Sequence, residues 1–346
     1  MKQKFRLFLI VLAATVLSVA VTAQESTRKF SKSWPAGEVE TLEIINKFGQ
    51  VKVSDNGSTQ VTIEVTVTAE GSESRARAVL DEITVSFGTL GRKATAETKF
   101  ASGFKSRSNF SIDYVVNIPA NKNLNINNKF GNVVVQNLTG RGAFDISYGN
   151  LTAGRMEGIG TDGFVLKLEY GKADIELLKE PRVYMAYAKL FLKSAENMVL
   201  ESKYSTMESE RINAIRIDSR YDTFNFGSVS VVEGDSKFTN YRIGTVEKRL
   251  RLVSGYGAVR VDHIPAEFEY IDINNSYAQI SLGIDPSAEY QVKATCEFCN
   301  IDFPQANFTG NRMKENTRQT MDGKISGGNK GRISVVSKYG NIRLVK

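Results

Sequence analysis

Cys296 and Cys299 are the only cysteines of the 346-residue chain, and together they form a Cys-x-x-Cys motif. Such a motif is redox-active when it begins a helix, because the helix N-terminus lowers the pKa of the thiol. Here the strand-like run Asn300 to Phe303 follows it. A structural zinc site needs four ligands at suitable spacing, and the chain has a single histidine. We therefore expect a disulfide between Cys296 and Cys299, or two inert thiols, rather than a redox or metal site.

The histidine and the carboxylates do not form a recognisable catalytic set. His263 follows Asp262 at a turn that leaves a strand, and no Gly-x-Ser-x-Gly nucleophile motif accompanies them. A β-helical polysaccharide lyase or hydrolase would need clustered carboxylates on neighbouring coils. The candidates by residue type occupy different positions in their repeats: Asp174, Asp218, Asp222 and Asp302. No phosphate-binding Gly-rich loop is present either. We therefore expect no catalytic, cofactor-binding or metal-binding residues, and no enzyme.

A short pattern recurs along the chain and must determine its architecture. An aromatic residue is followed by a small residue, a polar residue and an apolar-x-apolar triplet, as in Phe130-Gly131-Asn132-Val133-Val134-Val135. Ten copies between Phe130 and Phe298, including a weak one at Tyr241, have a mean spacing of about 19 residues. Further copies begin at Phe48 and Tyr339. The pattern predicts a structural ladder of aromatic residues, one per repeat: Phe130, Tyr148, Tyr170, Tyr187, Tyr204, Tyr221, Tyr256, Tyr277, Phe298 and Tyr339.

The parity of apolar residues changes at each aromatic residue. Before Tyr148, the apolar residues Phe144 and Ile146 step back by two, so we expect the aromatic residue to lie on the inward face of the preceding strand. After Phe130, the apolar residues Val133 and Val135 lie at odd offsets. A strand cannot change parity without a corner, and we expect the following glycine to supply the backbone freedom. Each repeat is then strand, corner, strand and turn, which is typical of one coil of a parallel β-helix.

A small polar residue recurs two positions before the aromatic residue. We expect a buried ladder in which each side chain hydrogen-bonds to its counterpart one coil away. The positions are Asn46, Asn128, Ser202, Ser219, Ser254, Asn275, Cys296 and Ser337.

The N-terminus has the features of an export signal. Lys2, Lys4 and Arg6 precede an apolar run from Leu7 to Val21, and Val21-Thr22-Ala23 resembles a cleavage site. The run is too short for a membrane-spanning helix, so we expect cleavage of residues 1–23 and no transmembrane segment afterwards. Cleavage removes three basic residues and lowers the formal net charge from +7 to +4. Basic residues are spread along the chain, which argues against a nucleic-acid partner.

Residues 24–120 form a distinct N-terminal β-rich region in this interpretation. Alternating runs at 61–67 and 112–118 predict strands, and apolar residues at helical spacing predict one short helix over 72–83. Residues 121–346 are expected to be the solenoid. Within it, the polar, Gly-rich stretch 304–332 is expected to be a loop before the last strand.

These motifs resemble a group of secreted bacterial proteins known as putative adhesins, found in Bacteroidota and related to autotransporter-adhesin head domains. The matching residues are Asn46-Lys47-Phe48-Gly49, Asn128-Lys129-Phe130-Gly131, the strand Ile112 to Pro119, and Tyr339-Gly340-Asn341-Ile342 after the Gly-rich loop. The resemblance covers nearly all of the mature chain. It implies a right-handed parallel β-helix-like solenoid in an all-β protein, and export. It brings no catalytic residues.

We expect a non-catalytic envelope or surface protein that presents an extended β surface to a glycan or protein partner. Alternatives from the sequence are a periplasmic scaffold or envelope-sensing accessory, and a carbohydrate-active β-helix enzyme. An exposed aromatic row could also stack on sugar rings, but the parity of the repeat favours a structural ladder. Export leaves three locations open: the periplasm, the outer-membrane surface and the extracellular medium.

Overall fold

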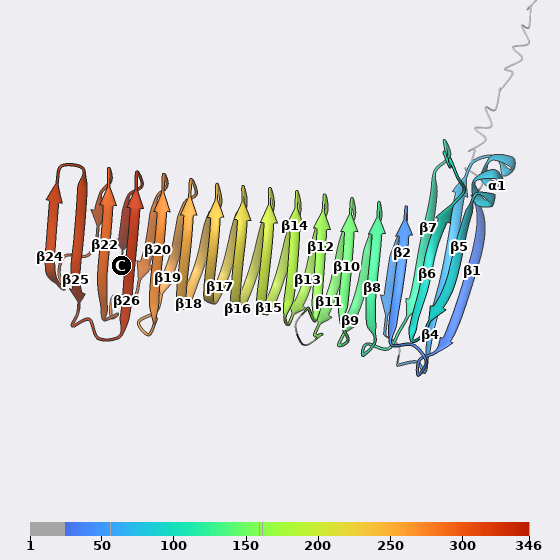
Figure 1. Ribbon diagram of the computed structural model, residues 1–346, viewed down its shortest axis with the longest axis horizontal. Helices are drawn as coiled ribbons and strands as arrows, with labels where there is room; N and C mark the ends of the chain where they lie inside the picture. The colour runs from blue at the N-terminus through green and yellow to red at the C-terminus, as the bar shows by residue number, and fades with distance from the viewer. Residues whose placement is uncertain (1–24, 56, 159, 161, 346) are drawn as a thin grey trace, which may run out of the picture.

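The computed structural model describes residues 25–55, 57–158, 160 and 162–345. They form an elongated β-solenoid with a capping region at each end (Figure 1). The expected all-β solenoid is therefore confirmed. The expected signal peptide, residues 1–23, lies outside the described residues. No helix in the described part of the chain is long and apolar enough to cross a membrane.

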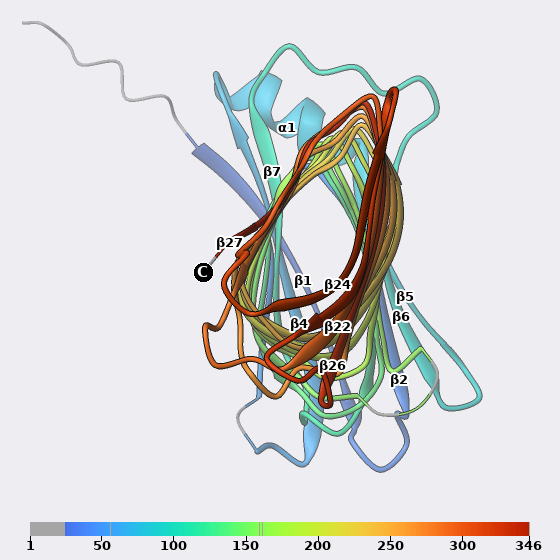
Figure 2. The same ribbon diagram turned by 90° about the vertical axis from the view of Figure 1, so that its left-hand side faces the viewer.

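Two rows of parallel strands make up the solenoid. The first row contains β2 (Thr41–Lys47), β8 (Asn123–Lys129), β10 (Gly142–Ser147), β12 (Phe164–Glu169), β14 (Pro181–Ala186), β20 (Tyr270–Ser276), β22 (Tyr290–Glu297) and β26 (Gly331–Lys338). The second contains β3 (Val51–Ser54), β9 (Val133–Leu138), β11 (Asn150–Met156), β13 (Lys172–Leu178), β19 (Val259–Ile264), β21 (Ile280–Ile284), β23 (Ile301–Asp302) and β27 (Ile342–Val345). Seen along its axis, the molecule is a stack of narrow coils (Figure 2).

Four long strands join the two rows in the middle of the solenoid. They are β15 (Lys189–Lys203), β16 (Thr206–Arg220), β17 (Thr223–Lys237) and β18 (Asn240–Gly255). Each begins in the second row and continues into the first row of the next coil, as the register of β15 with β13 and β14 shows. Elsewhere a turn, such as residues 265–269, connects the rows.

Inward side chains from both rows form one continuous apolar core. They alternate with outward side chains along each strand, as in β12, where Leu166 and Leu168 are buried while Lys167 and Glu169 are exposed. Because the coils pair in register, each inward side chain packs on its counterpart in the next coil, for example Leu166 on Val183. Burial of these rows supplies the main stabilisation.

The N-terminal end is capped by antiparallel strands and a helix. These are β1 (Glu25–Pro35), β4 (Gln60–Glu70), α1 (Glu73–Asp81), β5 (Ile83–Leu90), β6 (Lys93–Phe100) and β7 (Phe110–Asn117). The predicted helix and both predicted strands are confirmed. The helix buries Ala76, Val79 and Leu80, the residues whose spacing predicted it. β2 pairs with β6 and β8, so residues 41–54 form a coil of the solenoid, although they precede the boundary expected at residue 121.

The C-terminal end has a different order in space from its order in the chain. β26 lies between β20 and β22, and β27 lies between β21 and β23. The last coil is therefore inserted between two coils that precede it. Residues 304–332 are not a loop throughout, because β24 (Phe308–Glu315) and β25 (Arg318–Ile325) form a hairpin there. β25 pairs antiparallel with β22, and so covers an edge that would otherwise expose unpaired backbone groups.

Alkaline pH should destabilise the fold through buried tyrosines. Burial raises the pKa of Tyr114 to about 12, although its hydroxyl lies 2.8 Å from Thr98 Oγ1. Because the folded protein holds this proton more tightly than the unfolded chain, with its pKa of about 10, stability should be intact below pH ~10 and fall as pH rises from ~10 to ~12. In urea titrations at pH ~11, the free energy of unfolding of Tyr114→Phe should fall less than that of the unchanged protein, by about 1 kcal/mol. An equal fall in the variant and the unchanged protein would contradict the raised pKa of Tyr114.

Candidate functional site: the aromatic edge

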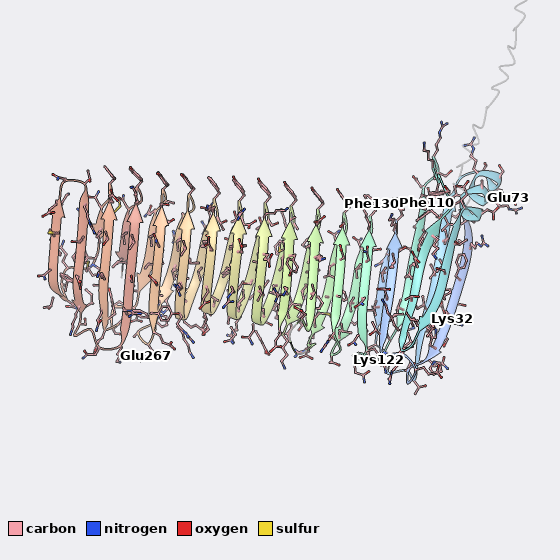
Figure 3. The ribbon with its side chains drawn as sticks, viewed as in Figure 1. Lys32, Glu73, Phe110, Lys122, Phe130 and Glu267 are labelled. Carbon is pink, nitrogen blue, oxygen red and sulfur yellow. A yellow bond between two sulfur atoms is a disulfide. The ribbon has the colours of Figure 1, made fainter. Side chains whose placement is uncertain are left out.

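Twelve aromatic rings of the described chain stack face to face along one edge of the solenoid. Neighbouring ring centroids are 4.6–5.2 Å apart and their planes differ by 1–21°. Figure 3 shows Phe130 at this edge, while Lys122 and Glu267 lie at the opposite edge. We call this row the aromatic ladder; in spatial order it comprises Phe48, Phe130, Tyr148, Tyr170, Tyr187, Tyr204, Tyr221, Phe238, Tyr256, Tyr277, Tyr339 and Phe298.

The expectation that the aromatic residues face inward is wrong. Every ladder residue has a positive φ of 52–63° and a side chain that is 37–53% exposed. A residue in the left-handed region turns its side chain out of the pleat of the preceding strand. The corner is therefore made by the aromatic residue itself, which explains why the parity of apolar residues changes there.

Two ladder positions differ from the sequence prediction. Tyr241 is buried in the core, and the ladder residue of that coil is Phe238. Its segment Phe238-Thr239-Asn240-Tyr241-Arg242-Ile243 fits the repeat when threonine is accepted as the small residue. In addition, Tyr339 lies between Tyr277 and Phe298, because the last coil is inserted.

The residue after each aromatic residue brings neighbouring coils close together. A Cβ atom added at Gly149 would lie 1.9 Å from the carbonyl oxygen of Gly131 one coil away. Glycine is thus needed there for close approach of two backbones rather than for a positive φ. In the middle coils polar residues replace it and bond across coils: Ser205 N donates to Asp222 Oδ1 (2.6 Å), and Asp222 N donates to Thr239 Oγ1 (3.3 Å).

The carboxylates that residue type alone suggested for catalysis do not meet. Asp222 is buried behind the ladder, where Ser219 Oγ donates to it at 2.6 Å; burial raises the pKa of this carboxyl. Asp174 and Asp218 lie on the outer faces of β13 and β16, in different rows, and Asp302 pairs with Arg343 at 3.7 Å. His263 is exposed on β19, while Asp262 accepts from Arg260 at 2.6 Å. The described residues contain no group of three or more potential metal ligands.

The small polar residues two positions before the aromatic residues hydrogen-bond to backbone groups more often than to one another. Asn128 Nδ2 donates to Gly49 O, and Asn275 Nδ2 donates to Gly257 O, both at 3.3 Å across coils. Within the row, Ser236 Oγ donates to Ser254 Oγ at 3.2 Å. The expected ladder of side chains bonded to one another is thus wrong for these asparagines, because their amides reach the corner carbonyls of the neighbouring coil.

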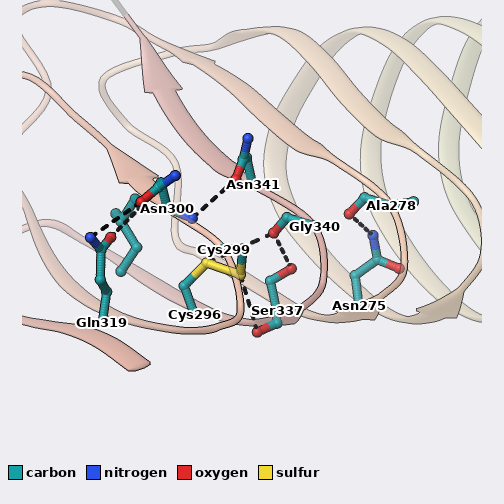
Figure 4. Close-up of a disulfide and its surroundings, with 10 residues drawn as sticks. Asn275, Ala278, Cys296, Cys299, Asn300, Gln319, Ser337, Gly340 and Asn341 are labelled. Carbon is teal, nitrogen blue, oxygen red and sulfur yellow. Dashed lines mark hydrogen bonds between the residues drawn. A yellow bond between two sulfur atoms is a disulfide. The ribbon is translucent and has the colours of Figure 1, made fainter. Parts of the chain in front are cut away.

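Cys296 and Cys299 form a disulfide across the last aromatic corner (Figure 4). Cys296 is fully buried and Cys299 is partly buried, and the carbonyls of Gly340 and Ser337 lie near the two sulfurs. The motif begins no helix, since β22 and β23 flank it.

The aromatic ladder offers ring edges and hydroxyls to a ligand, but few ring faces. Each internal ring is covered on both faces by its neighbours, so a sugar cannot stack on it in the usual way. Eight of the twelve ladder residues are tyrosines. Their hydroxyls make no hydrogen bond to another group of the described chain, and they remain available to a partner. The edge is therefore suited to binding a linear partner through hydrogen bonds and edge contacts.

The outer face of the second row is also hollowed. A groove of about 1200 Å³ crosses β9, β11, β13 and β15–β19 and includes Asp174, Phe191, Glu208 and Arg242 in its lining. Its charged lining is mainly acidic, with the two basic residues Lys193 and Arg242 and five acidic residues: Asp174, Glu176, Glu208, Glu210 and Asp262.

No family model and no curated protein matches the chain. Several solved structures match most of it, and they include the following three. A "putative adhesin" from Parabacteroides merdae has 12% identity and a TM-score of 0.34, with 94% of this chain and 98% of that chain covered. A "putative adhesin" from Bacteroides fragilis has 11% identity and a TM-score of 0.33, with 92% and 97% covered. A "putative cell adhesion protein" from Clostridium sporogenes has 11% identity and a TM-score of 0.21, with 92% and 99% covered. At these scores no function, ligand or partner transfers to this chain.

Proposed function

We propose that this chain is an exported, non-catalytic protein of the cell envelope or surface, with an adhesin role. The observation that carries the proposal is the aromatic ladder, an exposed row with one ring per coil along the solenoid. Contiguous exposed apolar surface of this kind marks interaction sites. A ridge that repeats with every coil suits an extended partner better than a small molecule, which needs a concave site.

Three further features support the proposal. The positively charged and apolar N-terminal segment 1–23 is typical of an export signal. In the described residues, the candidate carboxylates lie apart and no metal-ligand cluster occurs, which gives no support to the alternative of a carbohydrate-active enzyme. The in-register coils and the caps at both ends make a stiff rod, which can hold a binding edge away from an anchoring point.

The adhesin role can be tested with coated beads. Beads carrying residues 24–346 would be washed over immobilised mucin, fibronectin, collagen and peptidoglycan, with albumin-coated beads as the control. We expect retention above the albumin control on at least one surface. We also expect its loss when Tyr187, Tyr204 and Tyr221 are all replaced by serine, provided that circular dichroism shows the solenoid intact. Retention equal to the control on every surface would contradict the adhesin role.

A further inference from the structure

Basic residues are concentrated beside the aromatic ladder. Two outward rows flank it: the residue just before each ladder residue, and the residue two positions after it. These rows contain two acidic residues, Glu169 and Glu297, and the following eight basic residues: Lys47, Lys129, Lys172, Lys189, Lys203, Arg220, Lys237 and Lys338. They carry a net charge of +6 (8 − 2), whereas residues 24–346 together carry +4 (+7 minus Lys2, Lys4 and Arg6). The rest of the chain is therefore slightly acidic.

Five consecutive coils each place one cation beside the ladder. We call this part the basic edge segment; it comprises Tyr170, Tyr187, Tyr204, Tyr221 and Phe238 with Lys172, Lys189, Lys203, Arg220 and Lys237. Lys172 pairs in register with Lys189, and Arg220 pairs with both Lys203 and Lys237. At the strand spacing of about 4.8 Å, the segment is roughly 19 Å long.

This arrangement costs stability rather than adding it. Like charges directly opposite on neighbouring strands repel each other. Among the described residues, Lys189, Lys203, Arg220 and Lys237 have no carboxylate oxygen within 4.0 Å, and only Lys172 of the five has an ion pair, with Asp174 at 3.6 Å. Four of the five cations of the basic edge segment are therefore free to bind anions from solution.

An acidic row limits where such an anion can lie. Glu201, Asp218 and Asp235 are stacked in register on the same outer face, two residues before Lys203, Arg220 and Lys237. They lie on the side of the basic residues away from the ladder, and would repel an anion that moved onto the sheet. The favourable path is thus a line along the aromatic edge.

We propose that the basic edge segment binds a linear acidic polysaccharide that lies along the solenoid axis. This inference rests on the proposed function and names its ligand class. The spacing of the coils is about the length of one pyranose residue, so each coil can offer one cation to each anionic sugar. The tyrosine hydroxyls at the same edge can hydrogen-bond to sugar hydroxyls. Single-stranded nucleic acid fits less well, because its bases need free aromatic faces on which to stack, and these are covered.

Removing the cations tests the proposal. The variant Lys203→Gln/Arg220→Gln/Lys237→Gln is compared with the matched control Lys193→Gln/Arg242→Gln/Arg251→Gln, which removes three exposed cations away from the ladder. Binding is measured by titration calorimetry with polygalacturonate and with dextran sulfate, and neutral dextran is the blank. The edge variant should bind about tenfold more weakly and the control variant almost normally. The two polyanions distinguish a carboxylated ligand from a sulfated one.

A second variant tests the hydroxyls without disturbing the stack. Phenylalanine already occupies ladder positions at Phe130 and Phe238, so Tyr187→Phe/Tyr204→Phe/Tyr221→Phe should keep the rings stacked. We expect its affinity for the polysaccharide to fall about threefold or more, from the loss of hydrogen bonds.

Several outcomes would overturn the inference. Equal weakening in the edge and control variants would show attraction to net charge alone. If the protein bound neither polyanion, an acidic polysaccharide would be excluded as the ligand. Binding to anionic phosphatidylglycerol vesicles in place of the polyanions would also exclude it. If beads carrying the chain still adhered to one of the surfaces in that case, the adhesin role would stand with a different ligand.

Discussion

Replacing Phe224 with alanine should lower the free energy of unfolding by about 3–5 kcal/mol. Phe224 lies in β17, is fully buried, and packs against Phe226 and Tyr241 with ring centroids 5.6 and 5.4 Å away. Its removal leaves a cavity between the two strand rows that in-register neighbours cannot close without disturbing the pairing of several coils. Denaturant titration followed by far-ultraviolet circular dichroism measures the change.

Tyr221→Ala is the matched control, three residues away in the same coil. This ring is 47% exposed and stacks on Tyr204 and Phe238. Its loss should cost only about 1–2 kcal/mol, mainly from two lost ring contacts. Equal destabilisation by both substitutions would contradict the placement of the ladder outside the core.

Replacing Tyr204 with proline should lower the free energy of unfolding by more than about 3 kcal/mol. Tyr204 has a φ of 52°, and its N–H donates to Arg220 O at 3.0 Å across coils. Proline holds φ near −65° and has no N–H, so it can neither form this corner nor keep the hydrogen bond. The loss should appear as a lower denaturation midpoint in the same titration.

The Tyr204→Gly variant separates the backbone from the side chain. Glycine adopts a positive φ without strain, whereas other residues pay roughly 1–2 kcal/mol. The relief of backbone strain should offset much of the lost ring stacking, so we expect Tyr204→Gly to lower the free energy of unfolding by less than about 1.5 kcal/mol. A glycine variant as unstable as the proline variant would show that the ring, rather than the left-handed corner, holds the coil.

The repeat and the coil were predictable because each leaves a direct signal in the residues. Alternation such as Leu166 and Leu168 gives the inward row, and the change of parity at each aromatic residue gives the corner. The direction of the aromatic side chain was not predictable from parity alone. Two backbone geometries place apolar residues at the same sequence offsets: a strand that continues through the aromatic residue, and a strand that ends there in a left-handed corner. The first turns the aromatic ring into the core, whereas the second turns it towards solvent.

The order of coils at the C-terminus was hidden for a related reason. Every coil carries the same inward pattern, so the segment 331–345 can pair with any neighbour in the same register. Nothing in its residues indicates that it inserts between β20 and β22. The hairpin in 304–332 was missed because β24 is almost wholly exposed and lacks alternating apolar residues.

The candidate site was only partly visible in the sequence. The repeat pattern predicts ten of the ladder residues as a row, but it does not indicate that their side chains are exposed. Without that exposure, nothing in the pattern points to the charged residues beside the row. Lys203, Arg220 and Lys237 are 17 residues apart, the length of these coils, so a search for charge at the repeat spacing could have found the row.

Protease shaving of intact cells tests the central claim most directly. Cells that produce the protein are treated with protease and probed by immunoblotting, with a periplasmic protein as the control for envelope integrity. A surface adhesin should lose its band while the control remains intact. Protection of the band until the envelope is opened would contradict the adhesin role and assign the chain to the periplasm.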